Sequence, residues 1–222
     1  MAASLIETPH AKLAKHLSGQ RVTIPSILSL TPGWESHLNP NCHPYLETSI
    51  LEWQQKYIAS DHLLRINQRV NLPLFIRMAC PEADLNELCL VGKWYSWIFA
   101  YDDAIDHDYF KGKRAEREVY RDEALKCARF SLLGEDDAEH DPTALAPNFS
   151  LARGLYEIGF EIRQAIQQRL LRELICESMC EFINVAVDVG AFCESGDIAD
   201  LDKYFATRMY TSGVYPSIWM SL

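Results

Sequence analysis

A long run from Leu85 to Asp106 constrains the fold of this chain more than any other stretch. It contains no proline and one glycine, and its second half is almost wholly apolar or aromatic until it meets three aspartates: Trp94-Tyr-Ser-Trp-Ile-Phe-Ala-Tyr-Asp102-Asp103-Ala-Ile-Asp106. Read as a helix, Tyr95, Phe99, Asp102 and Asp106 recur at three- and four-residue steps and share one face. The run therefore predicts a central helix whose aromatic face ends in carboxylates one turn apart.

These carboxylates predict a magnesium site. Like charges one turn apart repel each other, and partial burial makes the repulsion worse. Mg²⁺ removes that cost, because it takes oxygen ligands from one or two carboxylates together with substrate phosphates. Asp102, Asp103 and Asp106 are the candidate ligands, and the apolar face behind them suits a substrate with a long apolar body and a diphosphate head. The alternative is a solvated acidic helix end, which the continuous apolar stretch behind it disfavours.

A second informative stretch lies near the C-terminus: Tyr204-Phe-Ala-Thr-Arg208-Met-Tyr-Thr211-Ser212-Gly213-Val-Tyr-Pro216. It predicts an arginine on a short helix that breaks at Thr211-Ser212-Gly213. The guanidinium group could grip diphosphate oxygens through two parallel hydrogen bonds. The break would leave backbone carbonyls without helical partners, and such dipoles can stabilise a carbocation. The alternative is an ordinary surface arginine before a helix-ending turn.

The remaining chain predicts an all-α fold of about eight helices in one domain, residues 1–222, with residues 1–21 as a loosely ordered arm. No stretch alternates with the period of a strand. The segment 134–150 is acidic, contains two prolines and predicts a surface loop. The predicted helix at Gly112–Leu133 carries mixed charge on its outer face. The other predicted helices are Tyr45–Tyr57, His62–Val70, Leu74–Cys80, Leu151–Gln168, Leu170–Cys193 and Asp200–Arg208.

Composition excludes several classes of protein. The formal net charge of -10 leaves no basic stripe for nucleic acid. No apolar run approaches the length that spans a bilayer, and the N-terminus lacks a signal-peptide core, so we expect a cytoplasmic protein. Seven scattered cysteines without a Cys-x-x-Cys pair predict reduced thiols.

Together, Asp102-Asp103-x-x-Asp106 after an aromatic helix and Tyr204-x-x-x-Arg208-x-x-Thr211-Ser212-Gly213 before a proline resemble the class I terpene synthases, specifically the fungal sesquiterpene cyclases. The resemblance covers most of the chain from about Val22 onward. It implies a helical bundle around an apolar cavity that holds three Mg²⁺ ions and a farnesyl diphosphate-like substrate.

The resemblance also implies roles for individual residues. Asp102 would be the main bridging metal ligand, with Asp103 and Asp106 supporting it. Arg208 would be the diphosphate sensor, Thr211 would be the linker residue, and the Ser212 carbonyl would be the effector of ionisation. The rings of Tyr95, Phe99 and Phe75, with Trp94, would line the pocket and stabilise cations; the alternative is that these rings are plain core.

One departure from the family pattern is pronounced. No Asn, Asp or Glu follows Arg208, so the family's second metal motif is absent, as is its C-terminal arginine-tyrosine pair. The chain therefore resembles a cyclase with its C-terminal helices missing. We expect an Mg²⁺-dependent terpene cyclase that acts on farnesyl diphosphate; the alternative is a truncated, catalytically inactive homologue. A chain-elongating prenyltransferase would need a second aspartate-rich motif, and a helical interaction protein would need no metal. The sequence leaves the oligomeric state open, with a homodimer among the alternatives.

Overall fold

The fold is all-α, as the sequence predicts. The computed structural model describes residues 8–21, 23–26, 29, 33, 37–41, 43–106, 109–110, 112–134 and 141–220, and these residues contain no strand. The helices are α1 (Pro9–Leu17), α3 (Pro44–Tyr57), α4 (Asp61–Arg69), α5 (Leu72–Ala79), α6 (Leu85–Asp106), α7 (Arg114–Leu133), α8 (Pro142–Leu145), α9 (Ser150–Ala165), α10 (Arg169–Ser195), α11 (Leu201–Thr211) and α12 (Val214–Met220).

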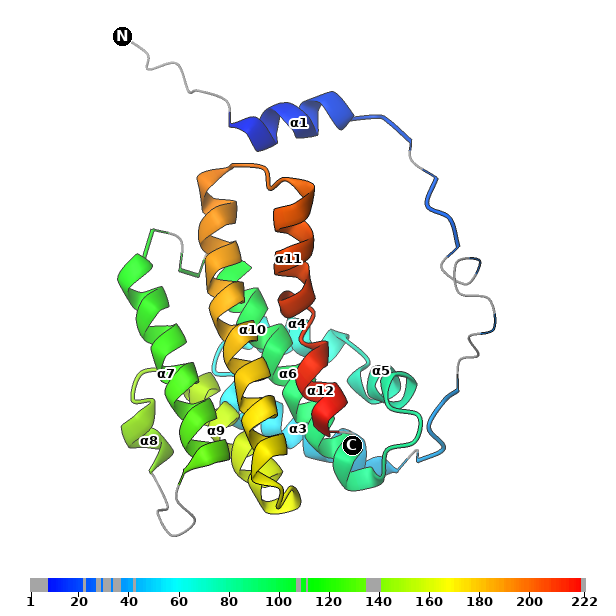
Figure 1. Ribbon diagram of the computed structural model, residues 1–222, viewed down its shortest axis with the longest axis vertical. Coiled ribbons are helices and arrows are strands. Elements are labelled where there is room, and N and C mark those ends of the chain that lie inside the picture. The colour runs from blue at the N-terminus through cyan, green and yellow to red at the C-terminus, as the bar shows by residue number, and fades with distance from the viewer. Residues whose placement is uncertain are drawn as a thin grey trace.

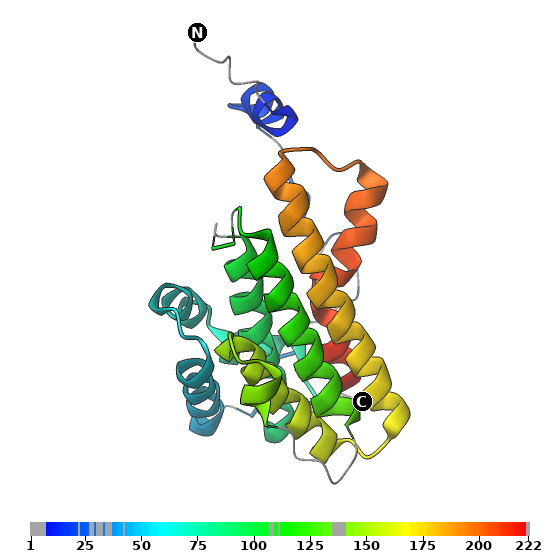
Figure 2. The same ribbon diagram turned by 90° about the vertical axis from the view of Figure 1, so that its left-hand side faces the viewer.

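Helix α6 is the element around which the bundle packs (Figure 1). It contacts α3, α4 and α5 as well as α9, α10 and α12. Helices α7 and α10 lie side by side, and α11 returns along α10 (Figure 2). Because α6 is surrounded, its apolar residues are buried around most of its circumference. The predicted central helix is therefore confirmed, with the bounds that the sequence indicates.

The start of α6 is fixed by local hydrogen bonds. The Asp84 side chain accepts from the backbone N–H groups of Asn86 and Glu87 at 2.8 and 2.9 Å, and the Glu87 carboxylate accepts from the Asp84 N–H at 2.7 Å. This reciprocal pair is a capping box. The buried Asn39 side chain donates to the carbonyls of Cys80 and Ala83 at 2.8 and 2.7 Å, which ties the N-terminal lead-in to the α5–α6 turn.

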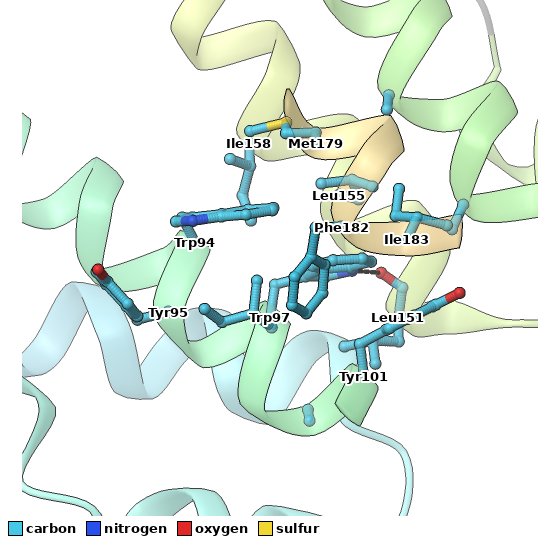
Figure 3. Close-up of a cluster of buried hydrophobic side chains, with 14 of the residues drawn as sticks. Trp94, Tyr95, Trp97, Tyr101, Leu151, Leu155, Ile158, Met179, Phe182 and Ile183 are labelled. Carbon is cyan, nitrogen blue, oxygen red and sulfur yellow. Dashed lines mark hydrogen bonds between the residues drawn. The ribbon is translucent and has the colours of Figure 1, made fainter. Parts of the chain in front are cut away.

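An aromatic core lies between α6 and α10 (Figure 3). Trp94, Trp97 and Tyr101 stack along one side of α6, and Phe182 of α10 packs against all three rings. The Trp97 indole N–H donates to the Leu151 carbonyl at 2.9 Å. This bond stabilises the buried ring, because an unpaired N–H in an apolar core is costly. The contacts lock α6 against both α9 and α10.

Three helices are absent from the sequence-based prediction. Helix α8 lies inside the predicted loop 134–150, of which residues 135–140 are outside the described part. Helix α12 follows the break at residues 211–213, where the sequence suggests an end. Helix α1 lies in the predicted loose arm; it has no buried side chain, and the His10 N–H donates to the Gly196 carbonyl at 3.1 Å.

Among the described residues, none of the helices combines the length and the apolar character needed to cross a bilayer.

Candidate functional site

The predicted carboxylates lie at the C-terminal end of α6. Asp102 and Asp103 are half-buried and Asp106 is exposed. Burial, followed by the negative charges of Asp106 and Asp103, raises the pKa of the Asp102 carboxyl from its ordinary 3.8 to about 6, and the positive charge of Arg208 opposes the rise. The ionised aspartates are therefore partly shielded from water and repel each other, as their spacing of one helical turn predicts.

This end of α6 suits a divalent cation that shares its coordination with a phosphate ligand. Within the described ranges, no group of three or more histidine, cysteine or carboxylate side chains converges on one point. Mg²⁺ needs only one or two protein carboxylates, because it keeps waters and takes phosphate oxygens. Burial and the neighbouring carboxylates disfavour the ionised form of Asp102, and a cation bound here would offset that cost. Asp108, the next acid along the chain, lies outside the described residues.

The predicted lining aromatics form one cluster below the aspartates. Phe75 of α5 meets Tyr95 edge to face, with ring centroids 4.9 Å apart, and Phe99 lies 5.9 Å from Tyr95 and 6.2 Å from Phe75. Tyr95 is buried, Phe99 is half-buried, and Phe75 is 39% exposed. The rings form an apolar wall on the face of α6 that leads to Asp102.

Trp94 belongs to the core and not to this wall, which corrects the sequence-based expectation. Its side chain has no exposed surface, it stacks on Trp97, and its indole N–H donates to the Gly213 carbonyl at 3.1 Å. Because α6 is apolar on nearly every face, periodicity alone cannot separate its core-facing rings from its wall-facing rings. The hydrogen bond joins α6 to the predicted helix break.

The break lies between α11 and α12. Gly213 has φ +64°, in the left-handed region that glycine tolerates, and a Cβ there would lie 2.5 Å from the Ile98 Cδ1 atom. On α12, the Ser217 hydroxyl hydrogen-bonds Tyr95, which connects this helix to the aromatic wall. The sequence gives no periodic signal for that contact, because α12 is only two turns long.

Helix α11 brings the predicted arginine to the aspartates. Arg208 is exposed, and its terminal nitrogen donates to the Thr211 hydroxyl at 3.3 Å, so the predicted sensor and linker residues are in contact. The Arg208 charge acts on the Asp102 carboxyl. The site thus has an acidic rim on α6 and a basic rim on α11, while Ser212 follows as the half-buried C-cap residue of α11.

A cleft of about 610 Å³ separates α11 from α10. Its lining is mostly apolar, with Val185, Val189 and Phe192 on α10 and Tyr204 on α11. Arg208 and Thr211 form part of the α11 wall. None of the residues of helix α11 is fully buried.

The described residues thus combine an acidic rim, an aromatic wall and an arginine in one all-helical bundle. The sequence profile described as "Terpene synthase family 2, C-terminal metal binding" matches residues 93–222, more than half of the chain. The matched region includes the aspartates, α10, α11 and α12. The chain belongs to this terpene synthase family.

Two of the proteins similar to this chain come from fungi. The chain is similar to the sesquiterpene cyclase hepA of Aspergillus oryzae, with 24% identity over 96% of this chain and 58% of the relative. It is also similar to the terpene cyclase braA of Annulohypoxylon truncatum, with 32% identity over 42% of this chain and 25% of the relative. The chain thus spans little more than half the length of the Aspergillus oryzae relative.

Solved structures show the same helical fold. The crystal structure of the SVS_A2 protein from ancestral sequence reconstruction aligns with a TM-score of 0.66 at 19% identity, over 85% of this chain and 54% of that chain. The predicted fold class, an all-α helical bundle, is confirmed by this likeness.

Proposed function

We propose that the protein is an Mg²⁺-dependent terpene cyclase that ionises farnesyl diphosphate and cyclises the prenyl chain to a sesquiterpene. The observation that carries the proposal is the Asp102 carboxyl, which is half-buried beside two other aspartates at the top of an aromatic wall and opposite an arginine. A prenyl diphosphate has the matching chemistry, because its head is anionic and its chain is apolar.

In this proposal both rims act on the diphosphate head of the ligand. Asp102, Asp103 and Asp106 would hold Mg²⁺, which would neutralise diphosphate charge. Arg208 would donate hydrogen bonds to diphosphate oxygens, and Thr211 would orient the guanidinium group through the contact described above.

The reaction would begin with heterolysis of the C1–O bond. The electron pair leaves with diphosphate, where Arg208 stabilises the added charge, and C1 becomes an allylic cation. The ring faces of Phe75, Tyr95 and Phe99 would stabilise the cation by their quadrupoles and fold the chain over them. The Ser212 carbonyl, at the C-terminal end of α11, would direct its dipole at the cation.

A second reading is a homologue that binds the diphosphate without cyclising the chain. The observation that favours it is the accessibility of α11, where Leu201, Phe205 and Met209 are 67%, 58% and 53% exposed. Cyclisation requires a cavity that excludes water, since water quenches the cation. An open site would release a linear alcohol or leave the substrate intact.

The test is incubation of the purified chain with farnesyl diphosphate and Mg²⁺, with the extract analysed by gas chromatography and binding followed by calorimetry. A cyclic hydrocarbon or cyclic alcohol that is absent from an Asp102→Asn control supports the cyclase. Mg²⁺-dependent binding without a cyclic product supports the second reading. No Mg²⁺-dependent binding by the folded chain contradicts both.

A further inference from the structure

Arg117, on the second turn of α7, is a buried charge with two acceptors. Its side chain is 4% exposed. One terminal nitrogen donates to the Phe110 carbonyl at 3.2 Å and to the Glu194 carboxylate. Among the described residues, the Nε atom of Arg117 has no hydrogen-bond partner. Both hydrogen bonds are made by the one terminal nitrogen. A buried guanidinium group held in this way must keep its partners, because an uncompensated charge is expensive.

The two acceptors come from two different segments, one that follows α6 and one at the end of α10. Phe110 follows the last aspartate of α6 by four positions, and its ring is fully buried against Tyr120. Glu194 lies in the last turn of α10. One turn earlier, Gly190 packs so closely on Ile105 of α6 that a Cβ there would lie 2.3 Å from the Ile105 Cγ2 atom. The end of α10 is therefore attached at two points beside the aspartates.

The end of α10 determines where α11 begins. Gly196, with φ +70°, reverses the chain directly after α10, and α11 then runs back along α10 (Figures 1 and 2). Since α11 buries no side chain of its own, its position depends on α10 and on the connection to α12. A shift at the end of α10 would therefore move Arg208 relative to Asp102.

We infer that Arg117 is a positioning residue that holds the α10–α11 pair, and with it Arg208, in place against the aspartate end of α6. It acts through Phe110 and Glu194 and touches no reacting atom. The effect of Arg117 on ligand binding rests on the proposed function, whereas its role in holding α10 and α11 in place does not.

Arg117→Met tests the inference, because methionine keeps the apolar stem while removing both hydrogen bonds. Glu194 is 38% exposed, so its carboxylate can hydrate once released and the variant can still fold. Arg153→Met is the matched control. The Arg153 guanidinium donates to the Ala146 carbonyl at 2.7 Å, between α8 and α9 and away from the aspartates. Arg117→Lys and Glu194→Gln complete the set.

Two measurements are made on each variant: amide hydrogen exchange, and calorimetric binding of inorganic diphosphate in the presence of Mg²⁺. We expect Arg117→Met to speed exchange in residues 190–211 and to weaken diphosphate binding on the order of tenfold, the range typical of residues that support metal ligands indirectly. Arg117→Lys should restore part of the protection. Glu194→Gln should show the same pattern to a smaller extent, and Arg153→Met should change only the segment around Ala146.

Unchanged exchange in residues 190–211 of Arg117→Met would overturn the inference. So would an equal loss of protection there in Arg153→Met, which would show that any loss of stability has the same effect. Faster exchange in Arg117→Met, together with a wild-type chain that binds no diphosphate, would support the positioning role and refute the proposed function.

Discussion

Asp102→Asn should make the metal-free protein more stable at neutral pH while abolishing its response to Mg²⁺. The amide has nearly the shape of the carboxyl group but carries no charge. The substitution therefore removes the repulsion from Asp103 and Asp106 and the cost of a partly buried anion. A residue selected only for stability would not give this result, because its replacement would lower stability.

The magnitude follows from the pKa. A rise from 3.8 to about 6 corresponds to about 3 kcal/mol at 1.36 kcal/mol for each pKa unit. Because Asp102 retains contact with solvent, screening reduces the figure to about 1–2 kcal/mol. The pKa of Asp102 is higher in the folded state than in the unfolded state. Below a pH of about 4 the carboxyl group is protonated in both states and does not destabilise the fold. The destabilisation grows as the pH rises toward 6 and reaches its full value above that pH.

The assay is urea denaturation followed by circular dichroism, at pH 5.0 and 7.5, without metal and then with Mg²⁺ and inorganic diphosphate. We expect Asp102→Asn to exceed the wild type by about 1–2 kcal/mol at pH 7.5 and by less at pH 5.0. Mg²⁺ with diphosphate should stabilise only the wild type. Glu52→Gln, an exposed charge removal on α3, should stay within about 0.5 kcal/mol of the wild type under every condition.

Two results would refute this reasoning. If Asp102→Asn were less stable than the wild type at pH 7.5, then the carboxylate would be compensated in the folded protein and would need no cation. If Mg²⁺ with diphosphate stabilised the variant as much as the wild type, the ligands would bind elsewhere.

Three further substitutions test other parts of the structure. Arg208→Gln should weaken diphosphate binding by about tenfold or more at saturating Mg²⁺, because a charge-assisted hydrogen bond is lost; unchanged calorimetric affinity would contradict the role. Gly213→Ala should cost about 1–2 kcal/mol for its positive φ plus the collision with Ile98, whereas Gly112→Ala has the same strain in open space and isolates the first contribution. Burial opposes ionisation of Glu157, but hydrogen bonds from a lysine and a tyrosine outweigh burial and lower its pKa; its stabilisation is therefore present above pH of about 4.3 and lost on acidification. Glu157→Gln should lower neutral-pH stability by about 0.5–1 kcal/mol, leaving the acid-side stability unchanged.

The sequence predicts the central helix well because several independent signals agree there. The absence of proline, the acid at Asp84 and the apolar run all favour a helix, and the observed capping box at Asp84 and Glu87 accounts for its start. The contact between Arg208 and Thr211 was not predicted, because α11 continues to Thr211, three residues beyond its predicted end, and residues three apart on a helix are neighbours.

Each missed helix has a proline in its first turn. Helices α1 and α8 begin with Pro9 and Pro142, and α12 has Pro216 in its first turn. Proline is read as the end of a helix, but in a first turn its missing N–H removes a donor that would have had no helical partner anyway. Sequence alone does not separate the two uses.

The role of Arg117 could not be predicted for a different reason. The helix that contains it carries charges on most of its faces, and the sequence suggests an outer face of mixed charge. The structure instead buries Arg117 and Glu123, each 4% exposed. Glu123 accepts from the backbone N–H groups of Asn148 and Phe149. Such burial depends on partners distant along the chain, which no local pattern records.

The two rims of the site rest on helices of very different local stability. Helix α6 is the most enclosed element of the bundle, while α11 buries no side chain. Elements with few buried contacts open locally at low free-energy cost. A ligand that spans both rims must hold α11 in the arrangement described above, so its apparent affinity is the intrinsic affinity multiplied by the fraction of molecules that already have this arrangement. Substitutions far from the ligand that raise this fraction would therefore tighten binding without adding a contact.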